Sequence, residues 1–313
     1  MNPNVPRQPR RPVHGVLLLD KPAGLTSNQA LQRAKRLYHA EKAGHTGTLD
    51  PLASGLLPIC FGAATKFAQA SLDADKAYRA TLQLGERTAS GDRETAVVER
   101  KPVDLAPGQV DTVLRQFEGS ITQLPPMYSA LKKDGRALYD YARAGVEVER
   151  QARPVRIHHI RRVSLEGAAL VIDVACSKGT YIRTLADDIG QALGCGAHLS
   201  ALRRTASGPL RLDDTVSFEK LDALDVASRD AVLHPTDCLL ALWPAFCLER
   251  DDAARFLTGL RRRVTAADAP AVRVYADSPR ACLGSGHVTA GELIADRLLS
   301  PAEVQVCASA REP

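Results

Sequence analysis

Hydrophobic positions along this chain follow two spacings, one typical of strands and one typical of helices. Short apolar or alternating runs predict strands over residues 15–19, 56–61, 77–84, 155–163 and 170–175, the last two joined as a hairpin. Apolar residues three and four apart predict helices from 26–27 to about 40, over 110–117, and from 180 to 194. This order predicts an α+β fold with a mainly antiparallel sheet flanked by helices.

The pattern changes near residues 243–248. Beyond that point one helix is expected over 251–260, and the segments VRVYA, ACLG and HVTAGELIADRLL suggest short strands with glycine turns. We therefore expect a Pro/Arg-rich disordered tail over 1–12, a large domain over 13–246 and a small module over 247–313.

Composition indicates an ordinary globular protein, with 45% hydrophobic and 25% charged residues. The first residues lack the apolar segment of a secretory signal, and no apolar run approaches membrane-spanning length. The seven cysteines are an odd number and are scattered, which favours reduced thiols over a disulfide framework. These features predict a cytoplasmic protein without a membrane partner.

The net charge of +5 is modest, but arginines gather in three places. These are the stretch 150–162, the pair Arg203–Arg204 and the triplet 261–263. Each alone fits a solvated face. Together they are compatible with a nucleic-acid partner without identifying one.

Several kinds of chemistry lack their residues. Cys195 and His198 form half of a zinc-ligand spacing, without a second pair, and His158 and His159 point to opposite faces of a strand. The carboxylates at 187–188 diverge on a helix, and P-loop, Gly-x-Ser-x-Gly and dinucleotide motifs are absent from the sequence. We therefore expect neither a metal nor a cofactor.

One carboxylate stands out, in the stretch GHTGTLDP at residues 44–51. Gly44 and Gly47 allow unusual backbone angles, while Pro51 restricts Asp50 to extended conformations. Such a loop can hold a carboxylate at one angle, as a nucleophile or general base requires, although an Asp that caps a helix is the commoner use.

This octet, preceded by GVLLLDKPAGLTS and followed by KAYRATLQLG, QLPPMYSALKKDGRALY, CSKGTYIRTLADDIG and GAHLSALRR, resembles the bacterial tRNA pseudouridine synthase B family. The phrases stand in the family's order from residue 15 to about 204. The resemblance implies a pseudouridine-synthase-like fold and, more weakly, a C-terminal β-barrel of the PUA type that binds RNA.

By this resemblance, the chain would isomerise the uridine at position 55 in the T loop of tRNA after flipping it out of the stack. Asp50 would be the nucleophile, attacking ribose C1′ or uracil C6 or acting as a base toward a glycal. Arg183 would orient Asp50 and stabilise its charge. Tyr78 would stack on the base and accept a proton at C5, and Tyr181 would shape the pocket.

The resemblance also implies binding roles for residues with ordinary explanations. Leu202 is by default a core residue but would line the uracil pocket, and His45 would contact the RNA around the flipped nucleotide. Lys21 and Lys66 can meet phosphate, although surface solvation is the expected state of each.

Two departures from the family pattern and three rival functions remain. The loop after Gly85 keeps Asp92 but has Thr95 where the family often has glycine, so we carry no role over from it, and the C-terminal module matches poorly.

The first rival is a guide-RNA-dependent synthase, which usually has Ser where this octet has Thr46. The second is an RNA-binding or chaperone protein without catalysis, and the third is a glycosylase that releases free uracil.

Overall fold

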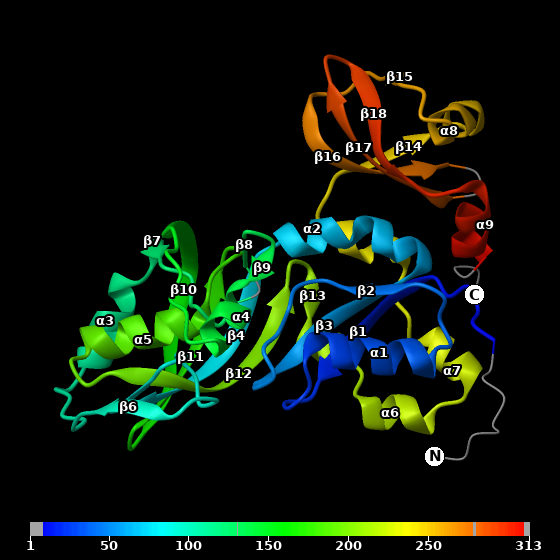
Figure 1. The fold of residues 1–313 in the computed structure, drawn as a ribbon. Coiled ribbons are helices and arrows are strands. Elements are labelled where there is room, and N and C mark those ends of the chain that lie inside the picture. The colour runs from blue at the N-terminus through cyan, green and yellow to red at the C-terminus, as the bar shows by residue number, and fades with distance from the viewer. Residues whose placement is uncertain (1–8, 130, 278–279, 310–313) are drawn as a thin grey trace. The chain divides into compact units, whose positions relative to one another are not determined.

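The computed structural model describes residues 9–129, 131–277 and 280–309. Its contacts divide the chain into two units. The first unit comprises Met1–Pro51, Gly55–Asp73 and Gly208–Pro313, and the second comprises Leu52–Ser54 and Ala74–Ser207. We describe each unit by itself (Figure 1).

The first unit begins with strands from the N-terminal motifs. Strand β1 (Gly15–Lys21) pairs antiparallel with β3 (Ala53–Phe61), and β2 (Ala43–His45) pairs with β3 as well. Helix α1 (Ser27–Leu37) starts at the cap Thr26, whose hydroxyl accepts from Gln29 N while the Gln29 side chain accepts from Thr26 N. The other elements of this part are η1 (Gly62–Phe67), α2 (Ala68–Asp73), β13 (Leu210–Arg211), η2 (Leu212–Asp214), α6 (Phe218–Ala223), α7 (Val226–Ala231) and η3 (Thr236–Leu240).

The C-terminal residues of the first unit form a separate five-stranded sheet, in the order β14-β16-β17-β18-β15. Its strands are β14 (Ala245–Leu248), β15 (Arg262–Arg263), β16 (Ala269–Ala276), β17 (Ala281–Thr289) and β18 (Glu292–Leu298). All of its pairings are antiparallel except β14 with β16. Helix α8 (Arg250–Leu257) buries Phe256 in the core of this module, and α9 (Pro301–Ser309) follows the last strand.

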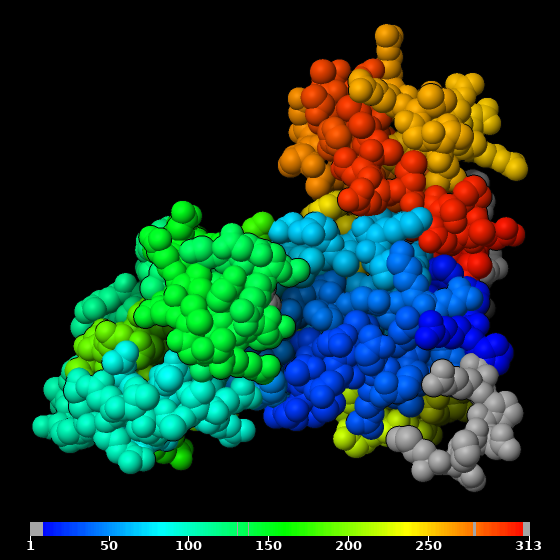
Figure 2. All heavy atoms as spheres, viewed as in Figure 1, coloured from blue at the N-terminus to red at the C-terminus, as the bar shows by residue number. Residues whose placement is uncertain are grey.

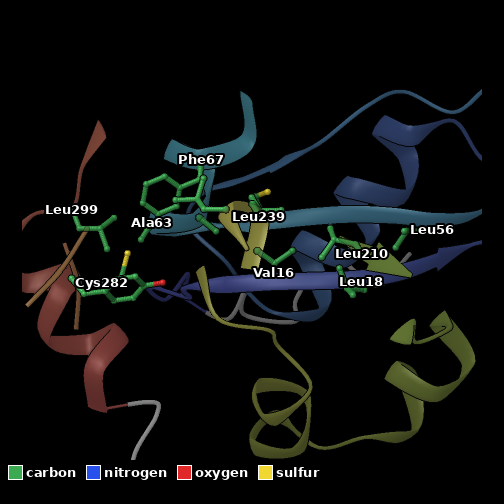
Figure 3. Packing of buried hydrophobic residues seen from close by; sticks show 13 residues of the cluster. Val16, Leu18, Leu56, Ala63, Phe67, Leu210, Leu239, Cys282 and Leu299 are labelled. Atoms are coloured by element: carbon green, nitrogen blue, oxygen red, sulfur yellow. The ribbon is translucent and has the colours of Figure 1, made fainter. Parts of the chain in front are cut away.

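One hydrophobic cluster joins the C-terminal sheet to the rest of the first unit (Figure 3). Val16 and Phe67 belong to it together with Leu239, Cys282 and Leu299. The space-filling view likewise shows the red C-terminal residues directly against blue and cyan residues of the same unit (Figure 2). The C-terminal sheet is therefore packed onto this unit rather than tethered by a linker alone.

The second unit is built on the strand order β12-β4-β11-β10-β7, and each neighbouring pair is antiparallel. These strands are β4 (Lys76–Leu84), β7 (Gly119–Gln123), β10 (Arg153–Glu166), β11 (Ala169–Cys176) and β12 (Ala197–Ser207). Helices α3 (Gln109–Gln116) and α5 (Ile182–Ala192) contact the sheet and each other (Figure 1). The smaller elements are β5 (Glu86–Thr88), β6 (Val97–Arg100), β8 (Lys132–Lys133), β9 (Arg136–Ala137) and α4 (Leu138–Arg143).

The α+β class, the antiparallel sheet and the hairpin of β10 and β11 confirm the predictions from hydrophobic spacing. Helix α1 ends at Leu37, three residues before the predicted end, because His39 takes a left-handed backbone conformation. Helix α9 was not predicted, since its sequence has almost no amphipathic pattern.

The predicted boundary at 246–247 is not one of the breaks between the two units, so the division into a domain over 13–246 and a module over 247–313 stays a prediction. Residues 1–8 of the predicted tail lie outside the described residues. Next to them, Arg11 forms two hydrogen bonds of 2.6 Å with the Asp230 carboxylate. Among the described residues, no helix is long and apolar enough to cross a membrane.

Candidate active site

The loop that carries Asp50 is tied at several points to its own unit. The Ser27 hydroxyl accepts a hydrogen bond from Leu49 N at 2.8 Å and donates one to Leu49 O at 3.1 Å. The buried Thr46 donates from its amide to Pro58 O at 3.1 Å and accepts from the Ser71 hydroxyl at 2.9 Å. The backbone on both sides of Asp50 is thereby fixed, and the Asp50 side chain is partly buried.

The turn after β1 lies beside this loop. Gly24 N donates to Pro51 O at 2.7 Å, so the KPAG and LDP segments meet. Lys21 is fully buried, and its ammonium donates to Pro22 O and Leu25 O. The expectation that Lys21 is a solvated surface lysine is therefore wrong, and its ammonium instead stabilises the turn.

His45 and Lys66 also belong to the first unit. His45 is the last residue of β2, pairs with Ile59 on β3 and is partly buried. Lys66 forms an ion pair of 2.5 Å with Glu303 and donates to Leu298 O at 2.9 Å. Burial raises the pKa of Glu303, but the Lys66 ammonium and the hydrogen bonds from Ser300 together outweigh it and lower that pKa. Lys66 thus links η1 to the C-terminal module.

In the second unit, Tyr78 and Leu202 lie on neighbouring strands. Leu202 on β12 is directly opposite Ala80 on β4, two residues from Tyr78 and on the same face of the sheet. Leu202 is buried, whereas Tyr78 is partly exposed. The structure therefore brings the predicted stacking residue and the predicted pocket leucine together.

Arg204 lies two residues after Leu202 on β12, on the same face of the sheet. It lies directly opposite Tyr78 and is 1% exposed. Burial lowers the pKa of its guanidinium, and a side-chain hydrogen bond with Tyr78 opposes this shift. From the sequence, Arg203–Arg204 was expected to be a solvated pair. That interpretation is wrong for Arg204, because the strand alternation turns it to the buried face.

Arg183 is held at the start of α5 by groups from two distant segments. Its Nη2 donates to Tyr128 O at 2.6 Å, and its Nη1 donates to Ser90 O at 3.3 Å. Nη1 also lies 3.4 Å from the Asp92 carboxylate, and the two side chains are only 5% and 2% exposed. Arg183 is therefore an anchored buried cation rather than a surface arginine.

The loop that supplies Ser90 and Asp92 is closed by its own hydroxyl groups. Asp92 Oδ1 accepts from the Ser90 hydroxyl at 2.5 Å and from Glu94 N at 3.0 Å. Thr95, where the family often has glycine, accepts from Ser90 N at 3.0 Å and shares a 2.8 Å hydrogen bond with the Ser90 hydroxyl. From the sequence this loop received no role, because Thr95 departs from the family pattern.

The backbone of Tyr181 is fixed by one buried amide side chain. Gln123 on β7 accepts from Tyr181 N at 3.0 Å and donates to Tyr181 O at 3.2 Å. Tyr181 is the N-cap residue of α5, so Gln123 fixes the helix start that carries both Tyr181 and Arg183. Further along, Gly190 lets α5 approach β12 closely, because a Cβ there would lie 2.1 Å from Ala197 N.

The two carboxylates on α5 differ from each other. Asp187 forms an ion pair of 2.7 Å with Arg87, whereas burial and the neighbouring Asp187 raise the pKa of Asp188 to about 6. Asp187 is therefore bound to an arginine of its own unit, while Asp188 is not part of that ion pair. Within the described part of the chain, no group of three or more His, Cys, Asp and Glu side chains could hold a metal ion.

The fold of this chain is similar to that of chains in two solved structures. The chain aligns with a chain of the "Crystal Structure of a Cbf5-Nop10-Gar1 Complex" with a TM-score of 0.73 and 25% identity, covering 97% of this chain and 92% of that one. It aligns with the "Structure of H/ACA RNP bound to a substrate RNA containing 2'-deoxyuridine" with a TM-score of 0.69 and 25% identity, covering 92% and 86%.

Sequence comparisons find relatives that are more similar to this chain than the solved structures are. Residues 35–182 match the TruB family pseudouridylate synthase N-terminal domain, and residues 183–241 match the tRNA pseudouridylate synthase B C-terminal domain. A tRNA pseudouridine synthase B from Verminephrobacter eiseniae is 58% identical over 97% of this chain and 94% of its own. Another, from Burkholderia mallei, is 53% identical over 94% of this chain and 96% of its own. The chain therefore belongs to the TruB family of tRNA pseudouridine synthases.

Proposed function

We propose that this enzyme acts on the uridine at position 55 in the T loop of tRNA and that Asp50 is its nucleophile. The reaction class comes with the family: the enzyme isomerises uridine to pseudouridine in tRNA. The choice of the T loop and the roles of individual residues are our proposal. They rest on the motifs and on the local geometry described above.

The reaction rearranges bonds within one nucleotide. The N1–C1′ glycosidic bond breaks, the uracil turns, and C5 bonds to C1′; the hydrogen on C5 leaves as a proton, and N1 takes up a proton in its place. Attack at C1′, attack at C6 and abstraction of a proton toward a glycal each start from an ionised carboxylate, which an aspartate supplies at neutral pH. Asp50 meets this need in all three routes.

The observation that carries the proposal is the fixed backbone around Asp50. Hydrogen bonds between Ser27 and Leu49, between Gly24 and Pro51 and between Thr46 and Pro58 hold the loop on both sides of the carboxylate. A carboxylate with fixed direction loses little entropy when it meets the ribose or the base. A surface turn with an exposed Asp cap would not need such tethers.

Arg183 is proposed to orient Asp50 and stabilise its charge. The guanidinium has five donors, so it can bind a further carboxylate in addition to Ser90 O, Tyr128 O and Asp92. The fixed start of α5 gives the guanidinium a defined position, which a flexible surface arginine would lack.

Tyr78, Tyr181 and Leu202 are proposed to receive the flipped uracil. Flipping costs a few kcal/mol, and stacking on an aromatic ring can return about 1–3 kcal/mol per base. Tyr78 and Leu202 share one face of the sheet, which suits a ring held between an aromatic and an aliphatic side chain. His45 is proposed to contact the RNA next to the flipped nucleotide. Lys21 and Lys66 receive no role, since both ammonium groups bind within the protein.

The test uses tRNA transcript labelled with tritium at uracil C5, with purified enzyme and EDTA. We expect one tritium released per tRNA, no free uracil, and pseudouridine mapped to position 55 by carbodiimide modification and primer extension. A transcript with cytidine at position 55 should release none. Release that persists with the cytidine transcript would contradict the T-loop target. Free uracil would indicate a glycosylase, and binding without release an RNA-binding protein.

A further inference from the structure

Arg204 is a buried cation that faces the proposed stacking residue. It is among the largest fully buried side chains of the described residues. Such a charge is costly inside a protein unless hydrogen bonds compensate for the lost water. Its cross-strand neighbour is Tyr78, and the two side chains form a hydrogen bond.

The chemistry of the two groups sets the direction of this hydrogen bond. A guanidinium has N–H donors and no acceptor, so the phenol oxygen of Tyr78 must accept. The hydroxyl hydrogen of Tyr78 then points away from Arg204 toward another acceptor. Tyr275 in the C-terminal module shows the opposite arrangement, because its hydroxyl donates to the buried Asp237 carboxylate. Burial, and after it this hydrogen bond, raises the pKa of Tyr275.

The arginines next to Arg204 and Tyr78 in the two strands bind other side chains. Arg203, on the other face of β12, donates to the Ser54 hydroxyl at 3.3 Å, and Arg79 binds the Asp173 carboxylate at 2.8 and 3.0 Å. On the β11 side, the residue opposite Tyr78 is the buried Val174, which offers no polar side-chain group. Of the two residues directly opposite Tyr78 on the adjacent strands, Arg204 is therefore the one whose side chain can orient the Tyr78 hydroxyl.

We propose that Arg204 is a positioning residue for Tyr78: it donates to the phenol oxygen from β12 and thereby directs the Tyr78 hydroxyl toward the base. The contact with Tyr78 stands by itself, and only its effect on catalysis rests on the proposed function. Arg204 touches Tyr78 rather than the reacting atoms, so its loss should slow the chemical step without weakening the binding of tRNA.

The test is a double-mutant cycle with Arg204→Gln and Tyr78→Phe, read as the single-turnover rate of tritium release and the Kd for tRNA. In the Tyr78 background, Arg204→Gln should slow the rate about 10- to 100-fold, the value of a hydrogen bond to a charged group, at unchanged Kd. In the Tyr78→Phe background it should cost less than about twofold, since no hydroxyl remains to orient. Equal losses in both backgrounds would overturn the proposal.

Two further arms make the result decisive. Arg204→Lys keeps the charge and a donor and should recover part of the rate, while Arg203→Gln is the matched control and should leave it unchanged. If Arg204→Gln does not fold, Arg204→Lys enters the cycle in its place. In protein labelled with 13C at tyrosine Cζ, the resonance that disappears in Tyr78→Phe should shift in the Arg204 variants. A resonance that does not shift would refute the contact between Arg204 and Tyr78. Failure of the wild-type enzyme to release tritium would instead refute the proposed function, and the two results can be told apart because the NMR measurement does not depend on activity.

Discussion

The loop that carries Asp50 and the helix start that carries Arg183 are held in different ways. Around Asp50, the Ser27–Leu49 and Thr46–Ser71 hydrogen bonds join residues 22 and 25 positions apart. Around Arg183, the hydrogen bonds to Tyr128 and Ser90 span 55 and 93 positions. The first site is thus largely encoded by two adjacent motifs, whereas the second exists only when its whole unit is folded.

The largest effect is expected when the guanidinium of Arg183, which is held by long-range hydrogen bonds, is removed. We expect Arg183→Met to lower the single-turnover rate about 1,000-fold, the usual cost of losing one charge-stabilising group. It should also destabilise the protein by several kcal/mol, because the Asp92 carboxylate stays buried without this cation. Tritium release and denaturant unfolding measure the two effects.

A second substitution separates the effect of Arg183 on the rate from its effect on stability. In Arg183→Met with Asp92→Asn, both buried charges are gone, so stability should return toward that of the wild type while the rate stays low. If the rate recovered together with stability, Arg183 would be a structural residue only.

Asp92→Asn alone should have a smaller effect. The amide keeps an acceptor for the Ser90 hydroxyl and Glu94 N but loses the charge facing Arg183. We expect a rate about tenfold lower and a loss of about 1–3 kcal/mol in unfolding free energy. A rate equal to that of the wild type would show that the position of Arg183 does not depend on this loop.

On the Asp50 side, Ser27→Ala removes two hydrogen bonds to the buried Leu49. It should cost about 2 kcal/mol of stability and speed hydrogen exchange at the Leu49 amide, with a rate a few-fold lower. Thr26→Ala is the matched control, since it weakens the cap of α1 by about 1 kcal/mol without touching Leu49. Equal exchange at Leu49 in the two variants would contradict the tether.

The smallest effect is expected at Asp188, which lies on the same helix as Arg183. Its raised pKa of about 6 means that the folded state disfavours the ionised form. Well below its ordinary pKa of 3.8 the group is protonated in both states and causes no loss, and stability falls as the pH rises from about 4 through 6. After allowance for its partial solvent exposure, Asp188→Asn should add about 1 kcal/mol at pH 8 and almost nothing at about pH 3. Thermal unfolding at both pH values measures this, and an equal gain at both would contradict it.

The same contrast explains what sequence could predict. The strands β1, β4 and β11 and the capped start of α1 follow from periodicity and capping chemistry, which act over a few residues. The tethers from Ser27 and Gly24 to the Asp50 loop join residues of two quoted motifs, so the loop was recognisable even though its hydrogen bonds were not.

Asp92, Gln123 and Arg204 were missed for a common reason. Each takes its role from a partner more than 50 residues away: Arg183, Tyr181 and Tyr78 respectively. In the sequence they are an acid in a polar loop, a strand-end amide and half of an arginine pair. Strand register gives the one usable signal, because the alternation of β12 places Arg204 on the same face as Leu202.

The measurement that tests the central claim most directly is tritium release from C5-labelled tRNA by wild-type enzyme and by Asp50→Asn, together with tRNA binding and unfolding of both proteins. Asparagine preserves the size of the side chain and removes its negative charge. We predict full release by the wild type, and for Asp50→Asn no detectable release, an unchanged fold and intact binding. Release by Asp50→Asn within tenfold of the wild-type rate would show that another residue is the nucleophile.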